Sequence, residues 1–248
     1  MLTVLIVIAL LGGWQAYTAL SGIDEFLLPS PTDVLSSLWD DRSLLWSNFT
    51  VTAREMALGL AISLVLGVVL ALTLHLSRAA RRGIYPLLIA SQTIPIVLVA
   101  PLLVAWFGYG VTPKLFVVAL VCFFPIVVPT LDGLRAVDDA KRKLLQTLGA
   151  SRWQQLRFVD APGALPSLFT GTRVAVAIAA IAAVLAEQAG SESGLGRLIT
   201  QSIPQLETAR AFAAVVVLSV FSLLLYAALG LAERRFLPWA HDPKGPQK

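Results

Sequence analysis

Charged residues are scarce in this sequence of 248 amino acids. Asp, Glu, Lys and Arg make up 14% of the chain, whereas hydrophobic residues make up 57%. An ordinary soluble domain contains about 25% charged residues, so the composition argues against a soluble protein. Several stretches without any charge are long enough to cross a bilayer, which takes about 20 apolar residues. The chain is therefore predicted to be an integral membrane protein.

The residue types that build metal centres and catalytic sites are also few. The single cysteine, Cys122, excludes an internal disulfide and a cysteine-based metal cluster, and the chain has only two histidines. Serine, histidine and acidic residues suggest no catalytic triad, and no GxxxxGK[ST] phosphate-binding motif occurs. We therefore expect no catalytic site, no metal site and no bound cofactor on this chain.

Charge-free stretches predict six membrane-spanning helices. Residues 1–23, 56–77 and 211–232 each provide one candidate. Residues 83–131 hold a single charge, Lys114, and the turn at 108–113 divides them into two spans. The weakest candidate covers 168–190, with Arg173 near its end. The predicted fold class is all-α, a polytopic bundle of six transmembrane helices.

Basic residues predict the orientation of this bundle, because they are enriched in cytoplasmic loops. With both termini in the cytoplasm, 13 lysines and arginines lie inside and 5 lie outside. This bias also accounts for the net charge of +4 without nucleic-acid binding. Residues 1–23 could instead be a signal peptide, but no basic residue precedes the apolar run, which favours a retained helix.

The chain is expected to have three regions. Residues 1–50 hold the first helix and an outside segment, in which a short amphipathic helix at 32–39 would be capped by Thr32 and Asp33. Residues 51–235 form a core of five spans with an inside loop at 132–167, and residues 236–248 form a cytoplasmic tail.

Small residues recur every four positions in two of the predicted spans. Such stripes allow helix backbones to approach closely. They therefore predict tight packing of the second and fifth spans without pointing to a particular function. The stripes are Gly59, Ser63, Gly67 and Ala71, and Gly171, Ala175, Ala179 and Ala183.

Polar residues within the spans are the candidates for a translocation path. They are Gln92, Thr93 and Pro95 in the third span, and Glu187 and Gln188 at the outer end of the fifth. Pro95 and Pro101 are expected to bend the third helix and free carbonyl groups, although Gln92 could simply form an interhelical hydrogen bond. Because no ionisable residue lies in mid-span, the energy for transport is expected to come from a partner.

The inside loop at 132–167 has the pattern of a helical elbow. Asp138 and Asp139 favour a helix start, Gly149 ends that helix, and Ser151 with Gln154 fits a capping box that begins a second helix. Two further residues, Pro162 and Pro166, are expected to break the chain before the fifth span. The elbow could rest on anionic lipid or could dock a soluble partner.

This loop resembles the EAA loop of ATP-binding-cassette (ABC) importer permeases. That pattern reads Glu-Ala-Ala, three residues, glycine, nine residues and Ile-x-Leu-Pro. Here Lys143-Leu144-Leu145 occupy the EAA positions before Gly149, and Val159, Ala161 and Pro162 occupy the last three. Residues 27–31 (LLPSP), 105–108 (AWFG) and 193–196 (SGLG) resemble the branch of nitrate, sulfonate, taurine and thiamine-precursor permeases.

The resemblance implies a division of labour in the bacterial inner membrane. Two permease subunits, as a homodimer or as a pair with a similar chain, would work with two cytoplasmic ABC ATPases, which bind ATP and Mg²⁺, and with an extracytoplasmic binding protein. Lys143 stands where the family usually has glutamate, which puts the matching charge on the ATPase in question. The coupling residues would be Lys143, Leu144, Leu145, Leu148, Gly149, Ala150, Ser151, Arg152, Val159 and Pro162.

The implied solute is small and polar or anionic, such as a sulfonate, nitrate, taurine or a thiamine pyrimidine precursor. The alternative is an ion-coupled secondary transporter, which uptake after ATP depletion would favour. A membrane-embedded enzyme is a further alternative, which turnover by the purified chain without an ATPase would favour.

Overall fold

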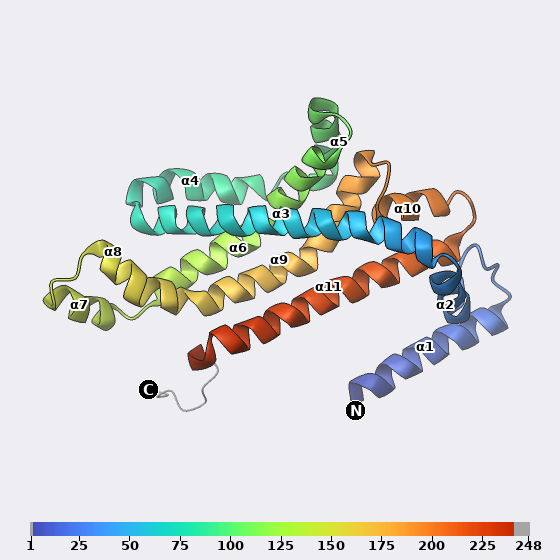
Figure 1. Cartoon of the computed structure of the whole chain (residues 1–248), viewed down its shortest axis with the longest axis horizontal. Coiled ribbons are helices and arrows are strands. Elements are labelled where there is room, and N and C mark those ends of the chain that lie inside the picture. Colours follow the sequence, from blue (N-terminus) through green and yellow to red (C-terminus); the bar gives the residue numbers. More distant parts are fainter. Residues whose placement is uncertain (1, 241–248) are drawn as a thin grey trace.

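The computed structural model describes residues 2–240, which form helices and connecting turns and contain no strand (Figure 1). The predicted tail at 236–248 therefore lies largely outside the described residues. The α-helices are α1 (Leu2–Ser21), α2 (Pro31–Asp40), α3 (Arg42–Leu76), α4 (Arg78–Ser91), α5 (Ile96–Phe107), α6 (Val111–Ala136), α7 (Asp139–Thr147), α8 (Arg152–Gln155), α9 (Ala161–Gly190), α10 (Leu195–Ser202) and α11 (Thr208–Phe236). A π-helical turn, η1 (Leu156–Asp160), joins α8 to α9, and a 3₁₀ turn, η2 (Pro238–Ala240), follows α11.

Five continuous helical stretches are long and apolar enough to cross a membrane: α1, α3, α6, the stretch from α8 to α9, and α11. The predicted third span is not one helix, because α4 and α5 meet at an angle of 98°. The pair counts as a sixth span only if it is treated as one broken crossing. The break lies at residues 92–95, so the predicted bend occurs at Pro95, whereas Pro101 lies inside α5 without breaking it.

The long helices alternate in direction along the longest axis of the molecule (Figure 1). At one end, which we call the elbow end, α7 and α8 project beyond the bundle; α2 and α10 lie at the opposite end. α1 runs toward the opposite end and α11 runs toward the elbow end. Residue 50, where the first region was expected to end, lies inside α3.

The core is formed where α3, α6 and α9 pack against one another. All eight residues of the two small-residue stripes are buried, so the predicted close packing is confirmed. A Cβ atom at Gly59 would lie 2.5 Å from Cγ1 of Val118, and one at Gly67 would lie 2.8 Å from Cγ2 of Ile126. Glycine therefore lets α3 approach α6 more closely than any larger residue would.

An ion pair joins α11 to this core. Arg173 in α9 pairs with Glu233 near the end of α11, and the Arg173 guanidinium also lies 5.7 Å from the ring centre of Tyr226. The charge of Arg173, which made the fifth span the weakest candidate, is thus compensated inside the bundle. Buried charges at membrane depth normally have such partners.

The segment between α1 and α3 differs from the prediction in its cap. The N-cap of α2 is Ser30, not Thr32 or Asp33, because Ser30 and Asp33 form a reciprocal capping box across three residues. Pro31 follows in the first turn, where its missing N–H costs little. At the other end of α2, Asp41 pairs with Arg210 of α11, with 2.9 Å between Oδ2 and Nε.

The inside loop is much shorter than the predicted 132–167. α6 continues to Ala136, and α9 begins at Ala161, so both prolines expected to break the chain lie within α9. Pro162 is tolerated in the first turn of a helix, which does not need its N–H, and Pro166 interrupts only one bond of a well-packed helix. The elbow itself therefore consists of α7, α8 and η1.

Candidate functional site

The elbow is shaped by local sequence signals. The Asp138 carboxylate accepts a hydrogen bond from the backbone N–H of Ala140 at 2.8 Å and caps α7. α7 ends before Gly149, whose φ of +77° lies in the left-handed region that favours glycine. Ser151 and Gln154 form the predicted capping box of α8. The helix, the glycine stop and the capping box are thus all confirmed.

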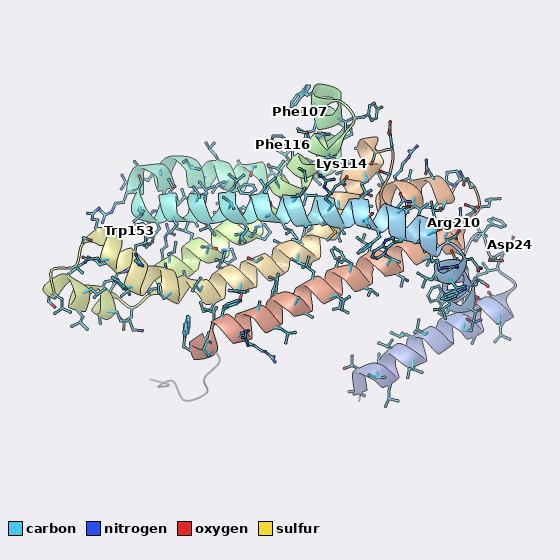
Figure 2. The ribbon with its side chains drawn as sticks, in the orientation of Figure 1. Asp24, Phe107, Lys114, Phe116, Trp153 and Arg210 are labelled. Atoms are coloured by element: carbon cyan, nitrogen blue, oxygen red, sulfur yellow. The ribbon has the colours of Figure 1, made fainter. Side chains whose placement is uncertain are left out.

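Large apolar side chains are exposed on this elbow. The side chains of Leu144, Leu148 and Trp153 are all mostly exposed. Figure 2 shows Trp153 at the elbow end. Leu156 is buried and anchors η1 in the hydrophobic core. Of the other coupling residues predicted from the sequence, Lys143, Gly149, Ser151 and Arg152 are exposed, and Leu145, Ala150, Val159 and Pro162 are partly buried. The structure therefore brings these residues together on the elbow, which has an apolar ridge, except for Pro162, which lies in the first turn of α9.

Arg142 fastens α7 to the bundle. Its guanidinium lies between Asp139 and Asp160, which it contacts at 2.9 and 2.8 Å. Partial burial lowers the pKa of Arg142, but the hydrogen bonds and charges of these two carboxylates raise it by more, so it lies above its ordinary value. The side chain is thus permanently charged, and the elbow cannot lose this contact by deprotonation.

The break between α4 and α5 leaves backbone groups unpaired. The N–H groups of Gln92, Thr93 and Ile94 donate to carbonyls three residues earlier. The carbonyls of these three residues accept no hydrogen bond from the described part of the chain. The side chains of Gln92, Thr93 and Pro95 are exposed. Three free carbonyl oxygens therefore lie close together at the end of α4, which runs alongside α3 (Figure 1).

Glu187 and Gln188 lie differently from each other. Glu187 is fully buried, whereas Gln188 is exposed. The Glu187 carboxylate accepts hydrogen bonds from the Thr52 hydroxyl and from the Gly196 N–H, both at 2.6 Å. The Leu195 N–H donates to the Thr52 hydroxyl at 2.8 Å. Glu187 thus binds the turn at 193–196 to α3 and, in this conformation, does not face an open path.

Two further charged residues that the sequence places outside the spans lie in the same buried region. Glu55 of α3 forms an ion pair with Lys114 of α6, and the Lys114 ammonium also donates to the Ser191 hydroxyl at 3.0 Å. Figure 2 shows Lys114 close to α5 and to the end of α9. A cavity of about 320 Å³ opens beside the pair and is also lined by Arg54 and Ser193. The only sequence signal for this cluster is that each charge borders a predicted span.

These groups offer no metal site, since the described residues contain no cluster of three or more His, Cys, Asp or Glu side chains able to hold a metal ion. The paired carboxylates are engaged with neighbouring helices. The structure presents a membrane bundle with a protruding apolar elbow at one end and a polar break between α4 and α5. This arrangement suits transport and docking better than covalent chemistry.

Comparisons with known proteins point the same way. The family described as "Binding-protein-dependent transport system inner membrane component" matches residues 63–238. The chain is 37% identical over 227 residues to the formylaminopyrimidine transport permease protein of Halalkalibacterium halodurans, covering 91% of this chain and 90% of that protein. It is 39% identical over 228 residues to the riboflavin transport system permease protein of Chloroflexus aurantiacus, covering 91% and 85%.

A solved structure has the same fold. The crystal structure of an amino acid ABC transporter with histidines matches with a TM-score of 0.63 and 18% sequence identity, covering 80% of this chain and 97% of that chain. At this identity the match bears on the fold alone.

Proposed function

The chain belongs to the family of binding-protein-dependent transport system inner membrane components, and from this premise we propose which parts of it meet the ATPase, the solute and the second permease copy. The chain is the permease of an ABC importer for a small solute, and it is a transport subunit rather than an enzyme. It spans the membrane several times. The observation that carries the proposal is the exposed apolar elbow on an otherwise membrane-embedded bundle.

The elbow is the docking surface for the ATPase. Leu144, Leu148 and Trp153 are exposed on the elbow, and Figure 2 shows Trp153 at the end of the molecule where the elbow projects. A cluster of large apolar side chains on a water-facing surface is typical of a protein contact. The ATPase would bind ATP and Mg²⁺, because this chain has no phosphate-binding loop. Because Lys143 at the edge of the ridge is positively charged, we expect the ATPase residue that faces it to be acidic or neutral.

Because the ATPase is cytoplasmic, docking at the elbow places the elbow end in the cytoplasm and the α2 and α10 end outside. Six basic residues in and around the elbow support it, in accordance with the enrichment of such residues in cytoplasmic segments. They are Arg135, Lys141, Arg142, Lys143, Arg152 and Arg157. Both termini would then be cytoplasmic, and the binding protein would meet the opposite end.

A matched pair of substitutions tests the docking surface. Leu144 in α7 and Leu35 in α2 are each 63% exposed, and both lie in short helices outside the spans. Leu144→Glu is expected to abolish co-purification of the ATPase with the permease, whereas Leu35→Glu, at the opposite end, should leave it intact. Equal co-purification of the ATPase with both variants and the unaltered chain would assign the ridge to lipid instead.

The solute path passes the break between α4 and α5. Non-helical backbone at membrane depth is tolerated only where it is buried in protein or faces water. The free carbonyls and the exposed Gln92 and Thr93 satisfy this condition if a second copy of the chain encloses them in a shared cavity. Gln188 would lie at the outer mouth of the same path, while Glu187 holds the adjoining turn. A homodimer is therefore the proposed assembly.

The solute class follows from the relatives and from the break. Two similar permeases are named for formylaminopyrimidine and for riboflavin, both nitrogen heterocycles. The break offers carbonyl oxygens, an amide and a hydroxyl but no cation of its own, so it suits a neutral hydrogen-bond donor better than a sulfonate or nitrate. Calorimetric titration of the cognate binding protein with a formylaminopyrimidine and with taurine tests this. Tight binding of taurine alone would contradict it.

ATP dependence separates this function from the ion-coupled alternative. The buried Glu55, Lys114 and Glu187 are the observation that favours a secondary transporter, since such carriers place ionisable groups in the bundle. In proteoliposomes holding the permease, the ATPase and the binding protein, solute uptake should require internal ATP and should persist without an ion gradient. Uptake driven by a proton or sodium gradient in the absence of ATP would favour the alternative.

A further inference from the structure

One buried carboxylate connects the elbow to two of the spanning helices. Asp160 is the last residue of η1 and is only 5% exposed. Its Oδ1 accepts a hydrogen bond from Nε of Arg142 in α7 at 2.8 Å. Its Oδ2 lies 3.0 Å from Nε2 of His75, the penultimate residue of α3. The two carboxylate oxygens of Asp160 thus contact two different helices, α7 and α3.

Arg142 extends this connection to α6. Its Nη2 donates to the carbonyl of Leu134 near the end of α6 at 2.7 Å, while Nη1 donates to the exposed Asp139. α7 buries none of its own residues, so apolar packing contributes little to its position. The guanidinium is therefore the main side-chain attachment of α7 to the bundle. Its planar fork can serve these acceptors together, which the single ammonium of lysine cannot do.

The position of Asp160 suits the transmission of movement. A π-helical turn is an irregular stretch of helix that is frequent at functional sites, and η1 directly precedes the long helix α9. Charge-assisted hydrogen bonds between partly buried groups are short and strong. A displacement of α7 is therefore passed to α3 and α6 rather than lost in the exposed elbow. The EAA pattern specifies no residue type at this position, which falls between Val159 and Ala161.

We propose that Asp160 is a positioning residue that, through Arg142 and His75, couples movement of the ATPase-bound elbow to α3 and α6. The proposal rests on the proposed function of the elbow as the ATPase docking surface. It assigns to Asp160 a role that depends on its carboxylate and not on its volume. Asparagine, which has nearly the same shape but no charge, should therefore impair the coupling.

Two fluorescent reporters can separate transmission from docking. Cys122 is buried, so single cysteines introduced at the exposed Thr147 of α7 or Leu76 of α3 can be labelled selectively. The labelled full-length permease is mixed with the ATPase and a non-hydrolysable ATP analogue. In the unaltered chain both reporters should respond. In Asp160→Asn, the Thr147 reporter should still respond, and the response at Leu76 should fall at least about threefold.

Matched variants make the result specific. Arg142→Lys keeps the charge but not the fork, so it should also lower the response at Leu76. Asp139→Asn removes the exposed carboxylate that Arg142 also contacts and should leave that response unchanged. A full response at Leu76 in Asp160→Asn and Arg142→Lys would overturn the proposal while leaving the docking surface intact. If the Thr147 reporter of the unaltered chain showed no fluorescence change on addition of the ATPase, the proposed function would be overturned, and this proposal with it.

Discussion

Single side chains at the α2 and α10 end show how one residue can join distant segments. The Thr52 hydroxyl donates to Glu187 and accepts from the Leu195 N–H, so it serves two partners at once. Thr52 and Glu187 are 135 residues apart in the sequence. Without the hydroxyl, a buried carboxylate oxygen and a buried N–H would both lose a partner.

Thr52→Val is therefore expected to destabilise the protein by about 1–3 kcal/mol, because unpaired buried polar groups carry a desolvation cost of this order. Thr50→Val is the matched control, since the Thr50 hydroxyl is exposed and bonds only within its own helix. The midpoint of thermal unfolding in detergent measures the difference. Equal shifts for the two variants would contradict the bridging role of Thr52.

Asp41 provides a pH-dependent contact outside the spans. Partial burial raises its pKa, but hydrogen bonds from Arg210 and Ser37 and the charge of Arg210 lower it by more, so the pKa lies below the ordinary value of 3.8. A carboxylate with a depressed pKa stabilises the folded state above its unfolded-state pKa. That contribution is lost as the pH falls through the folded-state pKa.

Asp41→Asn should accordingly lower the free energy of unfolding by about 0.2–1 kcal/mol at neutral pH, the range of a surface ion pair. The gap to the unaltered chain should close as the pH is lowered below 3.8. Unfolding midpoints measured across this pH range test it. Asp40→Asn, which removes a neighbouring exposed charge, should show no such gap, and a pH-independent gap for Asp41→Asn would refute the ion-pair explanation.

At the scale of elements, tight helix packing follows directly from small residues. Gly59→Val would force a side chain against Val118, because even a Cβ atom there lies 2.5 Å from Cγ1 of Val118. Overpacking of this kind costs about 1–3 kcal/mol, or a fall in melting temperature of about 2–4 °C per kcal/mol for a chain of this size. Gly13→Val in α1 is the control, because no atom lies within 4 Å of the Cβ position there. An equal fall for Gly13→Val would mean that helix propensity, not packing, decides the result.

Elements governed by local signals, and the place of the bend at Pro95, could be predicted from the sequence, whereas the angle of that bend could not. Gly149 as a helix stop and the Ser151–Gln154 capping box depend on neighbouring residues only, and both are confirmed. Pro166 fails as a predicted breaker because tertiary packing outweighs one missing hydrogen bond within α9. The 98° bend between α4 and α5 depends on how α5 packs against α6 and α9. Local sequence contains no information on that packing.

The candidate sites divide along the same line. The elbow residues lie within one stretch of sequence and were found as a group. By contrast, Asp160 and His75 are 85 residues apart, and Glu55 and Lys114 come from different helices. In the sequence Glu55, Lys114 and Asp160 appear only as charges beside apolar segments, and His75 lies within the predicted span 56–77. Their pairing is a property of the folded bundle.

At the scale of the whole molecule, the polar groups considered for docking and transport lie in three places: the elbow, the cluster at the opposite end, and the break between α4 and α5. The ends of a membrane bundle face water, whereas the break lies between two apolar helices and has free carbonyls. Exposed polar backbone is not stable in lipid. The free carbonyls at the break therefore need hydrogen-bond donors, which either water or a second copy of the chain must supply.

A cysteine in place of Gln92 tests whether water reaches the break in the assembled protein. In proteoliposomes, Gln92→Cys should react with a membrane-impermeant maleimide, at a rate that changes when the ATPase and a non-hydrolysable ATP analogue are added. Leu10→Cys is the control, because Leu10 is exposed on α1, which buries none of its residues in the bundle and should face lipid. The unaltered chain should stay unlabelled, since Cys122 is buried. If Leu10→Cys and Gln92→Cys reacted equally, or Gln92→Cys not at all, the break would not lie on a water-filled path.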